Sequence, residues 1–168
     1  WRYKIGDMIM FTDLSPYRFR ITGRTKSFIN AFGEELIVDN ADKALSVACA
    51  RTNAVIREYT AAPVYFSGNQ RGAHEWLIEF EKEPDDLDFF IESLDNALKS
   101  LNSDYEAKRY HSMILAEPLL RKVPNQTFYE WLKSKNKLGG QNKVPRLSNN
   151  RDLINEVLTI ARQLGYHE

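Results

Sequence analysis

The chain has 168 residues, a length that predicts one domain with room for a small appendage. Hydrophobic residues make up 43% and charged residues 27%, as in an ordinary soluble globular protein. The 23 basic and 23 acidic residues cancel, so net charge provides no general attraction to nucleic acid or to an anionic membrane. The single cysteine, Cys49, excludes an internal disulfide framework and a cysteine-rich zinc site.

The sequence shows no signal for membrane insertion or export. No apolar run approaches the roughly 18 residues of a membrane helix, and the first residues lack a basic stretch followed by an apolar one. We therefore expect a cytoplasmic protein with no membrane partner. Because the chain opens Trp-Arg-Tyr-Lys-Ile-Gly-Asp, without Met, we also expect it to be cut from a longer protein that holds the rest of an active site.

The N-terminal part predicts strands. Residues 3–22 predict two of them, because the apolar run over 7–12 ends in a Ser-Pro turn signal and apolar residues then alternate with arginines over 17–21. Residues 27–38 predict further strand, with a break at Gly33.

The middle of the chain predicts alternating helices and strands. Asp39 or Asn40 is expected to cap a helix, and a strand follows over residues 54–60. Residues 74–81 predict another strand with apolar residues on one face and glutamates mostly on the other, and residues 86–101 carry the most regular helical pattern. The acidic residues that begin at Glu79 are expected to lie in solvent.

Residues 34–123 therefore run strand, helix, strand, strand, helix, strand, with the last strand at 116–123. This is the order of a ferredoxin-like α+β domain with a βαββαβ core. Extra C-terminal helices follow: Thr127 and Glu130 form a predicted capping box, and residues 149–164 predict a last helix.

Three short segments carry side chains suited to nucleotide or phosphoryl chemistry. Asp7 follows a glycine, where a carboxylate can accept the hydroxyls of a ribose. Arg24 offers the planar donor fork that suits phosphate or paired hydroxyls. Lys143 follows a Gly-Gly loop that can deliver a positive charge to developing negative charge. Each segment alone is more often an ordinary turn or solvated loop.

Their order and spacing resemble a known family. Tyr-Lys-Ile-Gly-Asp over 3–7, followed by Gly-Arg-Thr-Lys over 23–26, is similar to adjacent motifs of the acyl-adenylate-forming superfamily. Residues 101–105, 124–130 and 140–146 (Leu-Asn-Ser-Asp-Tyr, Pro-Asn-Gln-Thr-Phe-Tyr-Glu and Gly-Gln-Asn-Lys-Val-Pro-Arg) resemble one branch, the auxin-responsive acyl acid–amido synthetases. The likeness covers nearly the whole chain and is loosest in the middle.

The resemblance implies a function and a set of roles. Such enzymes bind ATP, Mg²⁺ and a carboxylic acid, form an acyl-adenylate, and pass the acyl group to an amino acid. By position, Asp7 holds the ribose hydroxyls, Arg24 supports the ribose or the α-phosphate, and Lys143 is the catalytic lysine. Lys26 lies at the hinge between residues 1–25, the edge of a large N-terminal domain, and residues 26–168, a small mobile domain that has that larger domain as its partner.

The sequence departs from the superfamily pattern in two ways. The hinge position held by Lys26 is often Asp elsewhere, and no Gly- and Ser/Thr-rich phosphate loop is present. We expect that loop, the acyl pocket and most contacts to ATP and Mg²⁺ to precede Trp1, so the isolated chain should be inactive. Two alternatives stay open: a ligase with another acceptor such as coenzyme A, and a ferredoxin-like binding module without catalysis.

Other reactive side chains are assigned structural roles. The histidines His74, His111 and His167 are scattered without metal-ligand spacing, so no metal site is assigned. Cys49 lies on the apolar-leaning face of a predicted helix and is expected to be a buried structural thiol. A stripe of arginines and aromatic residues over 17–24 has the composition of an RNA-binding surface, but the neutral net charge argues against one.

Overall fold

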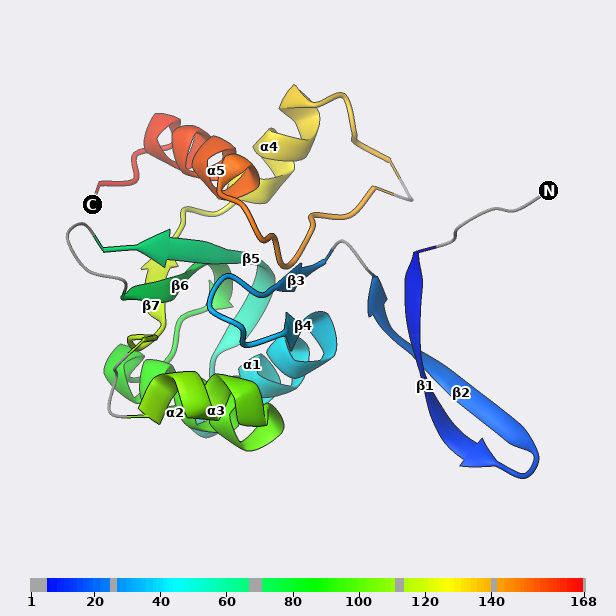
Figure 1. Cartoon of the computed structure of the whole chain (residues 1–168). Coiled ribbons are helices and arrows are strands. Elements are labelled where there is room, and N and C mark those ends of the chain that lie inside the picture. The colour runs from blue at the N-terminus through cyan, green and yellow to red at the C-terminus, as the bar shows by residue number, and fades with distance from the viewer. Residues whose placement is uncertain (1–5, 25–26, 67–70, 111–113, 140–141, 168) are drawn as a thin grey trace.

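The chain forms an N-terminal hairpin followed by a body of helices and strands (Figure 1). The computed structural model describes residues 6–24, 27–66, 71–110, 114–139 and 142–167. The strands are β1 (Asp7–Leu14), β2 (Tyr17–Arg24), β3 (Phe28–Ile29), β4 (Leu36–Ile37), β5 (Val55–Tyr65), β6 (Gly72–Lys82) and β7 (Leu119–Lys122). The helices are α1 (Val38–Thr52), α2 (Leu87–Leu101), α3 (Ser103–Arg109), α4 (Thr127–Ser134) and α5 (Asp152–Gln163).

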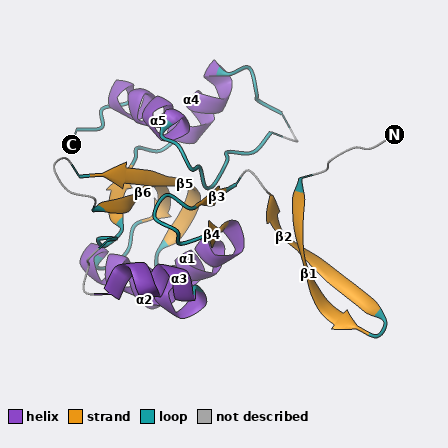
Figure 2. Ribbon diagram, viewed as in Figure 1, coloured by secondary structure: helices purple, strands orange, loops and turns teal. Residues whose placement is uncertain are grey.

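The body has three layers, with a three-stranded sheet of order β5-β6-β7 between two layers of helices. Strand β6 pairs with β5 antiparallel and with β7 parallel. Helices α1 and α2 cover one face of this sheet, and α4 and α5 lie on the other (Figure 2). Because helices cover both faces, the central strand β6 is buried from Gly72 to Phe80.

The first core lies between the sheet and helices α1 and α2. Trp76 and Ile78 project from β6 into it, and Phe90, Leu94 and Leu98 reach it from α2. All five side chains are fully buried. The spacing of the three α2 residues at positions i, i+4 and i+8 places them along one face, which explains why this helix was predictable from its pattern.

A second core lies on the opposite face of the sheet. Ala62 and Leu77 face Phe128 and Trp131 of α4 and Ile154 of α5. The two cores share no side chain, because successive residues of a strand point to opposite faces.

Strands β1 and β2 form an antiparallel hairpin that extends away from the body (Figure 1). Asp7 lies opposite Arg24 at the open end, and Leu14 lies opposite Tyr17 at the turn. Arg20 of β2 contacts the body through Asp39 of α1, with Nη2 and Oδ2 3.6 Å apart.

The α+β class with extra C-terminal helices is confirmed. The described residues do not form a single ferredoxin-like sheet. Strand β4, expected as the first strand of the βαββαβ core, pairs with β3 in a separate two-stranded sheet. Both strands are two residues long, and the segment between them turns back on itself around Glu34. Helix α3 was not predicted.

The N-cap of helix α1 lies two residues before Asp39, the earlier of the two predicted cap positions. The helix starts at Val38, and the N-cap residue is Ile37 rather than Asp39 or Asn40. The Asn40 side chain still serves the helix start, because its Oδ1 accepts a hydrogen bond from the Ile37 backbone N–H at 3.4 Å.

The capping box predicted from Thr127 and Glu130 is wrong. The N-cap of α4 is Gln126, which adopts a left-handed backbone with φ 70°. The carboxylate of Glu79 on β6 accepts from the backbone N–H groups of Gln126 at 2.9 Å and Phe128 at 3.3 Å. Glu79 was expected in solvent and is instead buried, because α4 begins directly over it.

Within the described residues, no helix is long and apolar enough to cross a bilayer.

Truncating Leu94 should destabilise the body. Leu94→Ala removes a fully buried side chain from the first core, so we expect the free energy of unfolding to fall by about 2–5 kcal/mol. Urea titration followed by circular dichroism measures it. Leu101→Ala on the same helix is the control, because Leu101 is 38% exposed and should change stability by less than about 1 kcal/mol. Equal losses in the two variants would contradict the packing described.

Candidate functional site

The predicted site residues lie on two parts of the molecule. Asp7 and Arg24 are brought directly opposite each other by the β1–β2 pairing. Lys143 lies in the loop between α4 and α5, on the body, and its side chain is exposed. That loop lies on the side of the body toward the hairpin (Figure 1). Lys26, the predicted hinge residue, lies outside the described residues.

The segment that follows Lys143, residues 144–148, is fixed against the edge of β5. Ala61 of β5 donates its N–H to the carbonyl of Arg146 at 2.9 Å, and the Ser148 N–H donates back to the Ala61 carbonyl at 3.0 Å. Val144 and Leu147 are buried, one in each core. Lys143 is therefore an exposed cation directly before an anchored segment.

A polar cluster strengthens this anchor. The guanidinium of Arg146 pairs with Asp42 of α1 and lies 5.3 Å from the ring centroid of Tyr59. The Tyr59 hydroxyl donates to the same Asp42 carboxylate at 2.6 Å. Burial, together with this hydrogen bond, raises the pKa of Tyr59 above its ordinary value, so the hydroxyl keeps its proton and acts as a donor.

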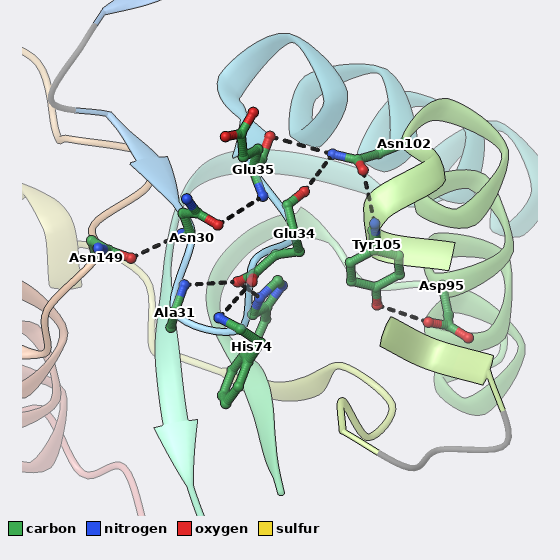
Figure 3. A network of polar contacts seen from close by, with 10 residues as sticks. Asn30, Ala31, Glu34, Glu35, His74, Asp95, Asn102, Tyr105 and Asn149 are labelled. Atoms are coloured by element: carbon green, nitrogen blue, oxygen red, sulfur yellow. Dashed lines mark hydrogen bonds and ion pairs between the residues drawn. The ribbon is translucent and has the colours of Figure 1, made fainter. Parts of the chain in front are cut away.

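A second polar network shapes residues 30–35, the segment between β3 and β4 (Figure 3). The carboxylate of Glu34 accepts the N–H groups of Ala31 at 3.2 Å and Phe32 at 2.7 Å, and lies 2.8 Å from Nε2 of His74 on β6. Both Glu34 and His74 are fully buried. A Cβ atom at Gly72 would overlap the ring of Phe32, so glycine is needed there for the segment to pack this close to β6.

The charge state of Glu34 follows from these contacts. Burial alone would raise its pKa, but the hydrogen bond and charge of His74 and the Phe32 N–H group outweigh burial, so the pKa lies below its ordinary value. Glu34 is therefore ionised at neutral pH, and Nε2 of His74 acts as the donor between them. Among the described residues, Nδ1 of His74 has no hydrogen-bond partner.

Asn102 joins this segment to helices α2 and α3. Its side-chain N–H groups donate to the carbonyls of Glu34 at 2.9 Å and Glu35 at 3.3 Å, while its Oδ1 accepts the Tyr105 N–H at 2.8 Å (Figure 3). The Tyr105 hydroxyl in turn donates to Asp95 at 2.8 Å. Asn102 lies in the Leu-Asn-Ser-Asp-Tyr segment that carries part of the sequence resemblance. In the structure this segment holds residues 30–35 against helices α2 and α3.

The same network reaches the loop of Lys143. The Asn30 N–H donates to Oδ1 of Asn149 at 2.9 Å, and Oδ1 of Asn30 accepts from the Glu35 N–H at 3.3 Å. Three segments distant in sequence are thus held together: residues 30–35, the α2–α3 junction and the end of the α4–α5 loop.

Sequence reasoning missed Glu34, named Asn102 only as part of the segment 101–105, and treated His74 as one of several scattered histidines. The acidic residue after Gly33 was the available signal, because a carboxylate in a short turn often accepts backbone N–H groups. Cys49 is half-buried against the first core, and burial raises its pKa, in keeping with a structural thiol. Across the described part of the chain, no group of three or more His, Cys, Asp or Glu side chains could hold a metal ion.

Comparison with known proteins places the body in a family. Residues 39–152, more than half of the chain, match the family model described as the GH3 family C-terminal domain. The chain belongs to the GH3 family. In this GH3 domain the matched residues run from the start of α1 to the start of α5 and include Lys143, Asn102 and the β5–β6–β7 sheet. No curated protein matches the chain.

Two solved structures share the fold of this GH3 chain. One is described as "GH3.15 acyl acid amido synthetase", with a TM-score of 0.71 and 18% sequence identity over 94% of this chain. The other is described as "AtGH3.15 acyl acid amido synthetase in complex with 2,4-DB", with a TM-score of 0.69 and 18% identity over 94% of this chain. The GH3 chain described here spans 31% and 30% of those two proteins.

Neutralising Glu34 should destabilise the domain in a pH-dependent way. Glu34→Gln replaces a buried carboxylate that accepts from the Ala31 N–H, the Phe32 N–H and His74, so we expect a loss of about 1.5–3 kcal/mol at neutral pH. Because the folded-state pKa is depressed, the stabilisation from ionised Glu34 is complete above its ordinary value of 4.5 and is lost as the pH falls through the lower, folded-state pKa. The gap between wild type and variant should therefore narrow in acid, as measured by urea unfolding at several pH values.

The neighbouring Glu35 provides the matched control. It is exposed, so Glu35→Gln should change the free energy of unfolding by no more than about 0.5 kcal/mol at any pH. A Glu34→Gln variant as stable as Glu35→Gln would show that the buried pair does not hold residues 30–35.

Proposed function

We propose that the chain is the C-terminal part of an ATP-dependent acyl acid–amido synthetase. In the proposed reaction a carboxylate attacks the α-phosphorus of ATP and releases pyrophosphate, giving an acyl-adenylate. The amine of an amino acid then attacks the acyl carbon, so that an amide forms and AMP leaves. The observation that carries the proposal is Lys143, an exposed cation directly before the anchored segment 144–148 of a GH3 domain.

Two further findings support the proposal. The two solved structures compared above are described as acyl acid amido synthetases. Each is about three times as long as this chain, as the covered shares of 31% and 30% indicate, so the activity, substrates and partners of a whole ligase are proposed here and extend beyond these residues.

Lys143 is suited to the adenylation step. Negative charge grows on the phosphoryl oxygens as the carboxylate attacks, so a cation held near them lowers the barrier more than it stabilises the ground state. The anchored segment 144–148 holds the backbone next to Lys143, while the exposed side chain is free to reach the carboxylate and the α-phosphate.

Asp7 and Arg24 are proposed to bind the nucleotide. Their direct pairing across the open end of the hairpin places a carboxylate residue and a guanidinium residue at adjacent positions. A carboxylate can accept both ribose hydroxyls, and a guanidinium fork suits the ribose or the α-phosphate. We assign no described residue to Mg²⁺, whose ligands we expect in the larger domain.

The division of the chain at the hinge is also part of the proposal. Residues 1–25 would form the edge of a large adenylating domain and residues 26–168 the small domain that rotates about Lys26. Large apolar side chains of the hairpin support this division, because so much exposed apolar surface is typical of a contact with another domain. They include Ile9, Met10, Phe11, Leu14, Tyr17, Phe19 and Ile21, which are 44–76% exposed.

Rotation would serve the two half-reactions. After adenylation the cation of Lys143 is no longer needed at the phosphate, whereas the amine must gain access to the acyl carbon. Such a ligase would work in the cytoplasm, where ATP and amino acids are available.

Removing the Lys143 amine should abolish most of the first half-reaction. In the intact ligase, Lys143→Ala should slow carboxylic acid-dependent ATP–pyrophosphate exchange by about 10²–10³-fold, the cost of losing one charge-stabilising group. Lys137→Ala, an exposed lysine earlier in the same loop, should leave exchange unchanged. Wild-type exchange in the Lys143 variant would contradict the catalytic role. If wild type forms adenylate but no amide with any amino acid, another acceptor such as coenzyme A is favoured, and no exchange at all favours a binding module.

Asp7→Ala tests the ribose contact separately. It should weaken ATP binding about ten- to a hundredfold, the cost of losing hydrogen bonds to a charged group, while affinity for the carboxylic acid changes little. Equilibrium binding of ATP and of the acid to the intact ligase, each measured by calorimetry, checks this. Equal losses for both ligands would argue against a ribose role.

A further inference from the structure

The side chain of Arg146, three residues after Lys143, is held from two sides. Its guanidinium pairs with Asp42 of α1 and lies over the ring of Tyr59 on β5. The Arg146 side chain is nevertheless 43% exposed, and that of Asp42 is 41% exposed. Because an ion pair this open to solvent contributes little to stability, the fold alone is a weak reason for the arrangement.

The bonds that join segment 144–148 to β5 leave one motion of the segment open. The Arg146 carbonyl and the Ser148 N–H bond to the backbone of β5, and both groups lie beyond the Arg146 Cα as seen from Lys143. Nearer to the lysine, the Pro145 carbonyl accepts from the Thr60 hydroxyl at 2.9 Å. A row of bonds to one strand still permits rotation about that row, and such a rotation would swing Lys143.

Two side chains oppose this rotation from opposite faces of the sheet. Val144 packs into the second core, on the face that α4 and α5 cover. Arg146 reaches the other face, where Asp42 lies on α1 and Tyr59 belongs to the first core. Gripped on both faces, the segment is fixed about its own axis, and so is the direction in which Lys143 leaves it.

The three side chains that make this grip form a closed triangle. The Tyr59 hydroxyl donates to the Asp42 carboxylate at 2.6 Å, while Arg146 contacts both of them. A planar guanidinium can lie over a ring and point its donors at a carboxylate at the same time, which an ammonium group cannot do. We call Arg146, Asp42 and Tyr59 the Arg146 clamp.

We propose that Arg146 is a positioning residue for Lys143, and that the Arg146 clamp fixes the direction of the lysine side chain. The inference rests on the proposed function, in which Lys143 acts on the phosphoryl oxygens. A misplacement of about 1 Å in a reacting group can cost roughly a hundredfold in rate. The clamp therefore matters for adenylation, which uses the lysine, and not for amide formation, which does not.

Steady-state kinetics of the intact ligase give the first test. Arg146→Ala should lower the kcat of acid-dependent ATP–pyrophosphate exchange about ten- to a hundredfold, while the KM values for ATP and the acid stay within about twofold of wild type. Arg146→Lys keeps the charge beside Asp42 but loses the planar fork, so its kcat should lie between those of Arg146→Ala and wild type.

An ion pair at the other end of the α4–α5 loop provides the matched control. Lys135 pairs with Glu156, and their side chains are 40% and 44% exposed, close to the values for Arg146 and Asp42. Lys135→Ala should change neither kcat nor KM. An unchanged kcat in Arg146→Ala, with wild type active, overturns the inference. Absent exchange in wild type instead refutes the proposed function.

A double variant tests whether Arg146 acts through the lysine. Exchange by Lys143→Ala/Arg146→Ala should be within about twofold of exchange by Lys143→Ala alone, because a positioning residue has no effect once the group it positions is gone. Losses that multiply would show that Arg146 acts independently of Lys143, by touching substrate or by supporting the domain, and would overturn the inference.

The second half-reaction separates positioning from general damage. The probe is the acyl-adenylate made chemically from the acid that supports exchange, given to the intact ligase together with the amino acid. Arg146→Ala should form the amide within about twofold of the wild-type rate, and its thermal midpoint should fall by less than about 4 °C. Equal slowing of exchange and of amide formation would indicate a loosened domain and would overturn the inference.

Discussion

Burial of β6 on both faces is the constraint on which the rest of the domain depends. The charged side chains between Gly72 and Phe80 are shielded from water, so each must be matched by a partner from another segment. His74 meets the segment between β3 and β4, Glu75 meets Arg121 of β7 and Arg151 before α5, and Glu79 meets the start of α4. The central strand thus determines where the segments around it lie, through pairings that an apolar strand would not provide.

The sequence predicted elements whose own pattern determines them. Helix α2 was predictable because its apolar residues follow the helical period, and α5 for the same reason. The burial of the second face of β6 was not predictable. Alternating glutamates are typical of a solvent-exposed face, and the arginines that pair with Glu75 lie some 46 and 76 residues away in the sequence. Strands β3 and β4 are too short for any periodicity, so their pairing depends on contacts made by Glu34.

The candidate site shows the same contrast between patterns that are local in the sequence and contacts between distant residues. Asp7, Arg24 and Lys143 were proposed because each lies in a short contiguous motif, and their roles stay predictions. The structure adds that Asp7 and Arg24 lie opposite each other across a hairpin. The groups that hold the site in shape were not predictable, since Asn102 acts on Glu34 across 68 residues. Candidate chemistry-bearing residues can be proposed from local motifs, whereas the residues that hold them in position act through tertiary contacts.

The irregular pairing at Ile56 leaves the register of β5 against β6 the same on both sides. Val55 lies opposite Lys82 and Glu58 lies opposite Glu79, so one residue is skipped on each strand, Arg57 on β5 and Glu81 on β6. An insertion or deletion of one residue in β5 would shift the register on one side of it, and the side chains of that part would move to the opposite face of the sheet. The length of β5 is therefore constrained as strictly as its residue types.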